Sequence, residues 1–159
     1  MRLGLHSFIR DRNGKVTVFD APNGTYTSAL SINDQGEVAG FCKRMSRVWA
    51  GSWFCADRKG LVTTFDVPGG VRTVATSINS MGEVAGYVTF PTIPTARGFV
   101  RTRSGDIVLI YVPDATQTSA VSINASGDVA GNFIDASQKV HGFVRFSAKP
   151  KDHDVSDSL

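Results

Sequence analysis

Residues 31–40 read Ser31-Ile32-Asn33-Asp34-Gln35-Gly36-Glu37-Val38-Ala39-Gly40. The chain repeats this segment with small changes at 77–86 and at 122–131, and the repetition is the main evidence for the fold class. Gly36, Gly82 and Gly127 mark the same place in the three copies and lie 46 and then 45 residues apart. A fixed period of this length indicates a repeat architecture. The repeat therefore has to be interpreted before any single motif.

Four short strands are predicted in each repeat. The first strand (28–33, 76–79, 119–124) ends at an Asn-x-x-Gly turn, where glycine supplies the positive φ that a tight turn needs. The second strand carries Val-Ala-Gly (37–42, 83–88, 128–134), and the third carries a repeated phenylalanine (Phe8, Phe54, Phe99, Phe143). The fourth strand (15–20, 61–66, 106–111) stops before a proline, which cannot donate to a sheet ladder.

These strands predict an all-β fold of three four-stranded meander repeats of the β-propeller blade type. The strands number thirteen, and the chain starts with the third and fourth strands of one repeat. A β-trefoil, which also uses three four-stranded units, is the alternative. The repeat domain covers residues 1–146, and the polar segment 147–159 is expected to be a disordered tail.

Three motifs of the chain stand together: the repeated Ser-Ile-Asn-x-x-Gly-x-Val-Ala-Gly, His141-Gly142-Phe143, and the Phe-Asp-x-Pro segments at 19–22 and 65–68. In these motifs the chain resembles a family of bacterial extracellular repeats named for a His-Ala-Phe motif. The resemblance covers roughly residues 6–146. It implies β-propeller-type repeats and an extracellular location. It implies no established activity or catalytic residue. The first residues show no secretory signal pattern, so the compartment stays open.

Composition excludes several classes of protein. The chain has 159 residues, 42% of them hydrophobic, and a net charge of +3. No apolar run reaches the roughly 18 residues that span a membrane as a helix. The modest positive charge is better explained by solvated loops than by a nucleic-acid interface. The Cys and His residues do not have metal-ligand spacing, so neither a metal nor a cofactor is expected.

No catalytic group is predicted. Ser31, Ser77 and Ser122 lack a nucleophile elbow, and the three histidines (His6, His141, His153) do not recur as a repeated base. Asp20 and Asp66 lie 46 residues apart and are interpreted as structural turn acids rather than as a carboxylate pair. Asn33, Asn79 and Asn124 are interpreted as caps of their own turns. The chain is therefore not expected to be an enzyme.

Cys42 and Cys55 flank the first hairpin between second and third strands and raise the question of a disulfide. If the register of the third repeat, Gly131 opposite Phe143, holds in the first, Gly40 lies opposite Phe54 and Cys55 lies opposite Ala39. The two cysteines then point to different faces. Two free thiols are therefore predicted.

The unrepeated loops 43–53, 89–97 and 135–140 are the candidate binding surface. In a meander these loops and the crossovers after the fourth strands emerge at the same end of each repeat. Aromatic and arginine side chains dominate recognition hot spots. The candidate ligand- or partner-binding residues are Lys43, Arg44, Arg47, Trp49, Tyr26, Arg72, Arg97 and His141.

Three repeats are too few to close a ring, and open sheet edges invite pairing with another chain. The predicted partner is a second copy, joined head-to-tail so that the strand at 15–20 completes the sheet at 118–146 of the other copy. A glycan or a protein is the possible ligand of the loop surface. The alternatives are a purely structural self-assembling repeat and a fragment of a larger propeller; a hydrolase is the least favoured.

Overall fold

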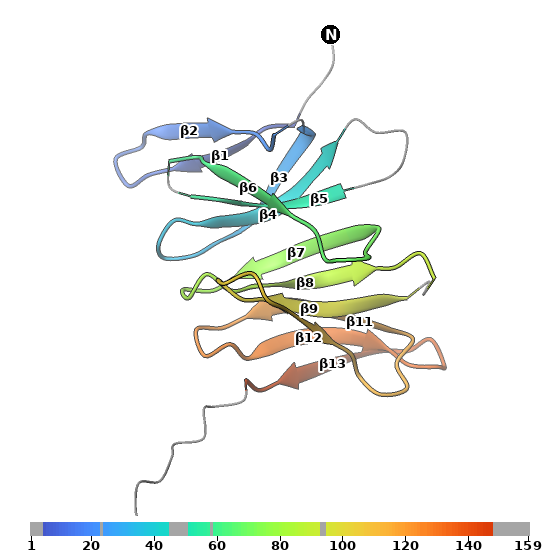
Figure 1. Cartoon of the computed structure of the whole chain (residues 1–159). Coiled ribbons are helices and arrows are strands. Elements are labelled where there is room, and N and C mark those ends of the chain that lie inside the picture. The colour runs from blue at the N-terminus through green and yellow to red at the C-terminus, as the bar shows by residue number, and fades with distance from the viewer. Residues whose placement is uncertain (1–4, 23, 45–50, 58, 93–94, 148–159) are drawn as a thin grey trace, which may run out of the picture.

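The computed structural model describes residues 5–22, 24–44, 51–57, 59–92 and 95–147. Within these residues the chain is all-β, with thirteen strands and no helix (Figure 1). The strands are β1 (Ser7–Arg10), β2 (Val16–Phe19), β3 (Gly24–Ile32), β4 (Val38–Arg44), β5 (Gly51–Ala56), β6 (Val62–Phe65), β7 (Arg72–Ile78), β8 (Val84–Thr89), β9 (Ala96–Arg101), β10 (Ile107–Ile110), β11 (Gln117–Ile123), β12 (Val129–Ile134) and β13 (Val140–Arg145).

The strands pair with their neighbours in sequence. β1 and β2 form an N-terminal hairpin, β3 to β6 a first meander, β7 to β10 a second meander, and β11 to β13 a third meander, each pair antiparallel. One parallel pair, Gly51 with Arg72, links the first meander to the second. Figure 1 shows the four groups following one another from β1 and β2 at the top to β13 at the bottom.

The cross-strand register repeats from meander to meander. Gly40, Gly86 and Gly131 lie opposite Phe54, Phe99 and Phe143. This confirms the register transferred from the third repeat to the first. Cys55 consequently pairs with Ala39, while Cys42, which is buried, pairs with Ser52.

The first strand of each meander is longer than predicted. β3, β7 and β11 begin at 24, 72 and 117, whereas the sequence predicted starts at 28, 76 and 119. Each strand also contains a β-bulge, between Ala29 and Ser31, Ala75 and Ser77, and Ala120 and Ser122. The bulge breaks the period-two alternation on which the prediction depended, so the residues before it were not predicted as part of the strand.

Buried threonines hold the crossovers in place. The Oγ1 atoms of Thr27, Thr73 and Thr118 accept hydrogen bonds from the backbone N–H groups of Ala21, Val67 and Val112, each six residues earlier and next to a proline. All three threonines are buried. Each bond satisfies a backbone donor that the crossover would otherwise leave unpaired.

The core lies between successive groups of strands. Phe19 and Ala21 of the N-terminal part pack on Val38, Cys42 and Ala56. Between the first and second meanders the cluster comprises Ala39, Ala75, Ile78 and Val84, and between the second and third it comprises Ala85, Val100, Ile110, Ala120, Ile123 and Val129. Each group therefore buries its faces against its neighbours rather than within itself.

Candidate functional site

The strand ends that flank the loops chosen from the sequence lie at one end of each meander. In the second meander Arg72, Thr89 and Ala96 are aligned across β7, β8 and β9, and Ile110 at the end of β10 pairs with Gly98. The β8–β9 connection and the crossover after β10 therefore leave from the same end, on the right in Figure 1. We call this end the rim.

Several residues expected in rim loops belong to strands instead. Lys43 and Arg44 end β4, and Arg97 and His141 are the second residues of β9 and β13. The predicted strand bounds were wrong at these positions because the hairpin ladders extend further than expected, through polar residues. Tyr26 and Arg72 lie in β3 and β7, while Arg47 and Trp49 lie outside the described residues.

The rim side chains pair locally. The Arg97 guanidinium carbon lies 5.8 Å from the centre of the Tyr111 ring, within the range of a cation–π contact. Tyr26, 40% exposed, meets Phe41 edge-on with ring centres 6.1 Å apart. Arg72 is exposed. Tyr26 belongs to the first meander, Arg72 and Arg97 to the second, and His141 to the third. Among the described residues, no hydrogen bond, ion pair or ring contact joins Tyr26, Arg72, Arg97 and His141 to one another.

His141 is held in the third meander by two neighbours. Its ring stacks on Phe133 with centres 4.9 Å apart, and its Nε2 lies 2.8 Å from Asp135 Oδ2. The His141 hydrogen bond, followed by the backbone N–H of Lys139, lowers the pKa of Asp135 below its ordinary value. Asp135 also caps its turn by accepting from the N–H of Ser137.

The repeated asparagines cap their own turns, as the sequence predicted. Asn33, Asn79 and Asn124 each accept a hydrogen bond at Oδ1 from the backbone N–H four residues later. Their Nδ2 groups donate to the Glu37, Glu83 and Asp128 carboxylates. The Asn-x-x-Gly-acid spacing of the repeat thus builds a turn in which both the oxygen and the nitrogen of the asparagine amide are used.

The same amides also join neighbouring meanders, a role that the sequence analysis missed. Asn33 Nδ2 donates to the carbonyl oxygen of Asn79 at 2.9 Å, and Asn79 Nδ2 donates to that of Asn124 at 3.0 Å. Asn124 donates to Asp128. Its amide has no further acceptor in the described part of the chain. The series of amide bonds therefore stops at the third meander.

The repeated serines form a second series of contacts. Ser31 Oγ accepts from the backbone N–H of Ile78 at 3.2 Å, and Ser77 Oγ accepts from that of Ile123 at 3.3 Å. Ser122, the third member, is exposed. These hydroxyls therefore serve the interface between meanders, which is a structural rather than a nucleophilic role.

Exposure shows where this repeated interface is left open. Ile78 and Ile123 are 6% exposed because they pack against the preceding meander, near Ala39 and Ala85 respectively. Ile32, at the same position of the first meander, is 58% exposed. At the opposite end of the chain Ala130, the counterpart of the fully buried Ala39 and Ala85, is exposed. We call the Ile32 side the leading face and the Ala130 side the trailing face.

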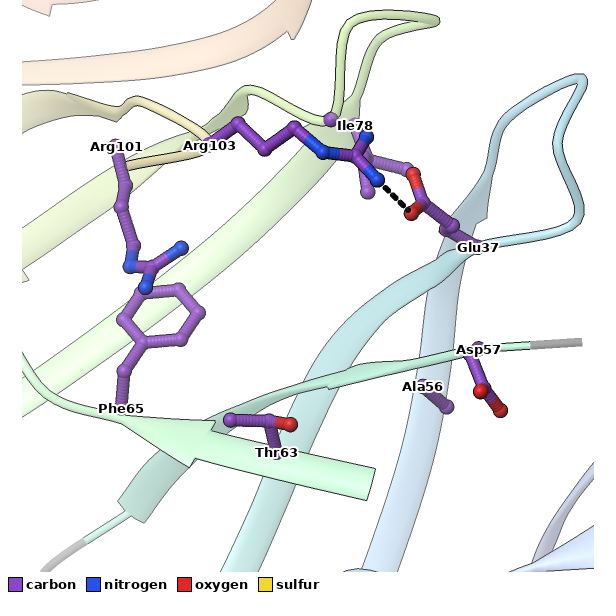
Figure 2. Close-up of a pocket in the computed structure, with 9 residues that line it drawn as sticks. Glu37, Ala56, Asp57, Thr63, Phe65, Ile78, Arg101 and Arg103 are labelled. Carbon is purple, nitrogen blue, oxygen red and sulfur yellow. Dashed lines mark hydrogen bonds and ion pairs between the residues drawn. The ribbon is translucent and has the colours of Figure 1, made fainter. Parts of the chain in front are cut away.

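A shallow cavity lies at the turn end of the first and second meanders (Figure 2). Arg103 bridges it with an ion pair to Glu37 at 3.1 Å, and the Arg101 guanidinium lies 4.5 Å from the centre of the Phe65 ring. The other residues that line the cavity are Ala56, Asp57, Thr63, Ile78 and Gly82. The two arginines are thus engaged by groups of the first meander, and they tie the two meanders together.

The carboxylates considered for catalysis also have structural partners. Asp20 binds His6, with Nδ1 2.8 and 2.9 Å from its two oxygens, across the N-terminal hairpin. This contact gives Asp20 a structural partner just after the end of β2. In the described residues no group of three or more His, Cys, Asp or Glu side chains is arranged to hold a metal ion.

Two sets of repeated residues escaped the sequence analysis. Thr27, Thr73 and Thr118 recur two residues before Ala29, Ala75 and Ala120, a Thr-x-Ala spacing that is visible in the sequence. The interface role of the Ser-Ile-Asn segment carries no separate sequence signal, because turn capping already accounts for the asparagine.

Comparison with known proteins assigns no relative. A scan against protein-family models and a search of the curated proteins both give no match. Within the described residues no helix is long and apolar enough to cross a membrane.

Proposed function

We propose that this chain is a non-catalytic β-propeller-type repeat protein, and that it acts as an interaction module whose first partner is a second copy of itself. The trailing face of one copy packs on the leading face of the other at both junctions. The result is a closed head-to-tail ring of six repeats. Closed cyclic assemblies of this kind leave no interface unfilled.

The contrast between Ile32 and its two counterparts carries the proposal. Ile78 and Ile123 are buried beside Ala39 and Ala85, whereas Ile32 and Ala130 are left exposed at opposite ends of the chain. Packing Ile32 of one copy on Ala130 of the other would repeat an interface that the chain already forms twice. Burying an isoleucine side chain contributes about 1.5–3 kcal/mol.

Polar groups at the two faces complement one another in the same way. The Asn124 amide and the Ser122 hydroxyl lie at the trailing face. The Asn33 carbonyl and the Ile32 N–H lie at the leading face, and their counterparts at 79 and 78 bind the preceding meander. The interface is heterologous, with donor and acceptor roles divided between the two faces.

A propeller-type arrangement is favoured over a β-trefoil for the same reason. The clusters that form the core lie between consecutive meanders, as they do between packed blades. Figure 1 places the N-terminal hairpin and β13 at opposite ends of the stack, which fits an open arc of a larger ring.

Mass in solution tests this proposal. The wild-type chain is expected to have twice its 17.0 kDa mass in sedimentation or light-scattering measurements at micromolar concentration. Ile32→Glu should give a monomer that remains folded, because the side chain is exposed in the single chain but would place an unpaired charge in the junction. Met81→Glu, at an exposed position in a turn of the second meander, is the matched control and should stay dimeric. A folded wild-type monomer would instead favour a fragment of a larger propeller.

A ligand site at the rim is the second candidate function. The observation that favours it is the contact of Arg97 with Tyr111 and of His141 with Phe133, which present basic and aromatic groups together at that end. A glycan or a protein would be the ligand. A glycan array should show binding that Arg97→Ala and Trp49→Ala weaken and Met81→Glu leaves unchanged. Absence of binding to any glycan would remove the lectin-like version.

A further inference from the structure

In the described part of the chain, the third meander has three strands, whereas the first and second have four each. β6 pairs with β5 and β10 pairs with β9, each antiparallel over four residues. β13 pairs with β12 on one side, and in the described residues no strand covers its other edge. Val140 and Val144 of β13 are 68% and 59% exposed. An open edge of this kind presents unpaired N–H and C=O groups to another strand.

The chain also carries a strand of the missing type. β2 pairs with β1 so that Ser7 lies opposite Phe19, the pairing that Gly98 makes with Ile110 in the second meander. By the repeat, β1 corresponds to β9 and β13, and β2 corresponds to β10. β1 and β13 are therefore equivalent strands of the repeat, and either of them can pair with β2.

We propose that β13 of one copy displaces β1 of a second copy and pairs antiparallel with the β2 of that second copy, completing a four-stranded sheet from two chains. This inference rests on the proposed head-to-tail association and specifies its junction. The equivalence of the pairings sets the register as Gly142 with Phe19, Phe143 with Val18, Val144 with Thr17 and Arg145 with Val16.

The number of cross-strand pairs that each strand makes favours β13 over β1 as the strand beside β2. β13 makes six cross-strand pairs with β12, and Phe143 packs on the cluster around Val129. β1 has four residues, and its Phe8 is 62% exposed. If β13 stays beside β12, all six of its cross-strand pairs are kept. If β1 took the place of β13, at most four residues could pair with β12. The cost is the release of the Ser7 hydroxyl, which donates to Thr27 O and accepts from Ala29 N in the single chain.

The side chains at the junction are complementary. His6, Arg97 and His141 each stand two residues before the repeated phenylalanine, and Asp20 occupies the position of Tyr111. Within one chain His6 Nδ1 binds Asp20, and Arg97 lies over Tyr111. Pairing β2 with β13 brings Asp20 of the second copy beside His141. His141 uses Nε2 for Asp135, so Nδ1 remains for Asp20.

Disulfide trapping tests the register. Thr17→Cys with Val144→Cys places one cysteine on each partner strand at directly opposed positions, and a disulfide needs Cα atoms within about 7 Å. Equal amounts of isotopically light and heavy protein are mixed and oxidised, and the linked peptides are mapped by mass spectrometry. We expect most of the protein to become a cross-linked dimer, with a light peptide joined to a heavy one through the two introduced cysteines. The control pair Val16→Cys with Val144→Cys, displaced by one residue, should give only traces.

The outcomes separate the junction from the association. A dimeric mass without a disulfide between the two introduced cysteines would overturn the strand pairing and leave the head-to-tail association standing. A monomeric mass would overturn both. A third pair, Ile9→Cys with Ala130→Cys, tests the alternative in which β1 of the second copy replaces β13 beside β12. Ala130 pairs with Val144 in the single chain, and Ile9 is the residue of β1 that corresponds to Val144. A strong intermolecular link from this pair would show that β1 replaces β13, and would contradict the proposal.

Discussion

At the scale of single residues, the glycine of Val-Ala-Gly has the same close backbone contact in the second and third repeats. A Cβ atom on Gly86 would lie 1.9 Å from the Val74 carbonyl oxygen and 2.8 Å from the Ala75 Cα, both backbone atoms of β7. On Gly131 it would lie 2.1 Å from the Ser119 carbonyl oxygen. The bulge in the neighbouring strand brings the backbones this close, so only glycine fits.

Gly86→Ala should therefore destabilise the protein by about 3 kcal/mol or more, because the backbone atoms in its way cannot move without disturbing the ladder. Gly142→Ala is the matched control. Its nearest heavy atom would be 4.0 Å away, so the free energy of unfolding should change by less than about 0.5 kcal/mol. Urea denaturation of the two variants measures the difference. Equal midpoints would contradict the close approach.

At the scale of elements, turns with a repeated acceptor hold the strands in register. Asp11 and Asp57 accept two backbone N–H groups each in the β1–β2 and β5–β6 turns, and Asp135 does the same between β12 and β13. Asp135 alone of these three also binds a histidine, His141. That second bond distinguishes the β12–β13 turn.

The pKa of the Asp135 carboxyl should lie below the ordinary value of an aspartate in the wild-type protein, since the His141 hydrogen bond lowers it most. A folded-state pKa below the unfolded value means that the ionised group stabilises the fold above that unfolded value. This contribution is lost as the pH falls through the folded-state pKa. In His141→Asn the Asp135 pKa should move upward, as followed by carboxyl-carbon NMR. His6→Asn is the control and should leave the Asp135 titration unchanged.

At the scale of the whole molecule, the described strands form a hairpin followed by three meanders, and the two ends of this series present unlike faces. The leading face exposes Ile32 and the trailing face exposes Ala130 and Ser122. Unlike faces join head-to-tail, so each copy of a two-membered ring takes part in two junctions. Identical faces would give one junction with a twofold axis between the copies.

Mixing two variants distinguishes these geometries. Ile32→Glu and Ala130→Glu should each be monomeric alone, because every junction then contains a glutamate. A mixture of the two contains one junction in which Ala130 meets Ile32 without a substitution. The mixture should therefore recover part of the dimer in sedimentation experiments. If the mixture stays as monomeric as its components, the faces do not meet each other.

Much of the element layout could be predicted from the sequence, because it depends on neighbours along the chain or across one hairpin. The Asn-x-x-Gly turns and the Gly40–Phe54 register follow from local hydrogen bonds and from the alternation of a strand. The starts of β3, β7 and β11 were missed because a bulge hides the alternation. The rim residues were predicted as loop residues because their polarity resembles that of a loop, although the ladders extend through Lys43 and Arg97.

Short strands and glycine turns can be predicted for this protein from the residues alone, since they depend on residue types a few positions apart. The second role of Ser31-Ile32-Asn33 is visible only in the folded chain, where the serine and the asparagine bind residues of the next meander, 47 and 46 positions away. The tertiary structure also decided that Ile32 is exposed while Ile78 and Ile123 are buried. The physical reason is that burial depends on which strands pack against a side chain, and that differs among copies of one sequence motif.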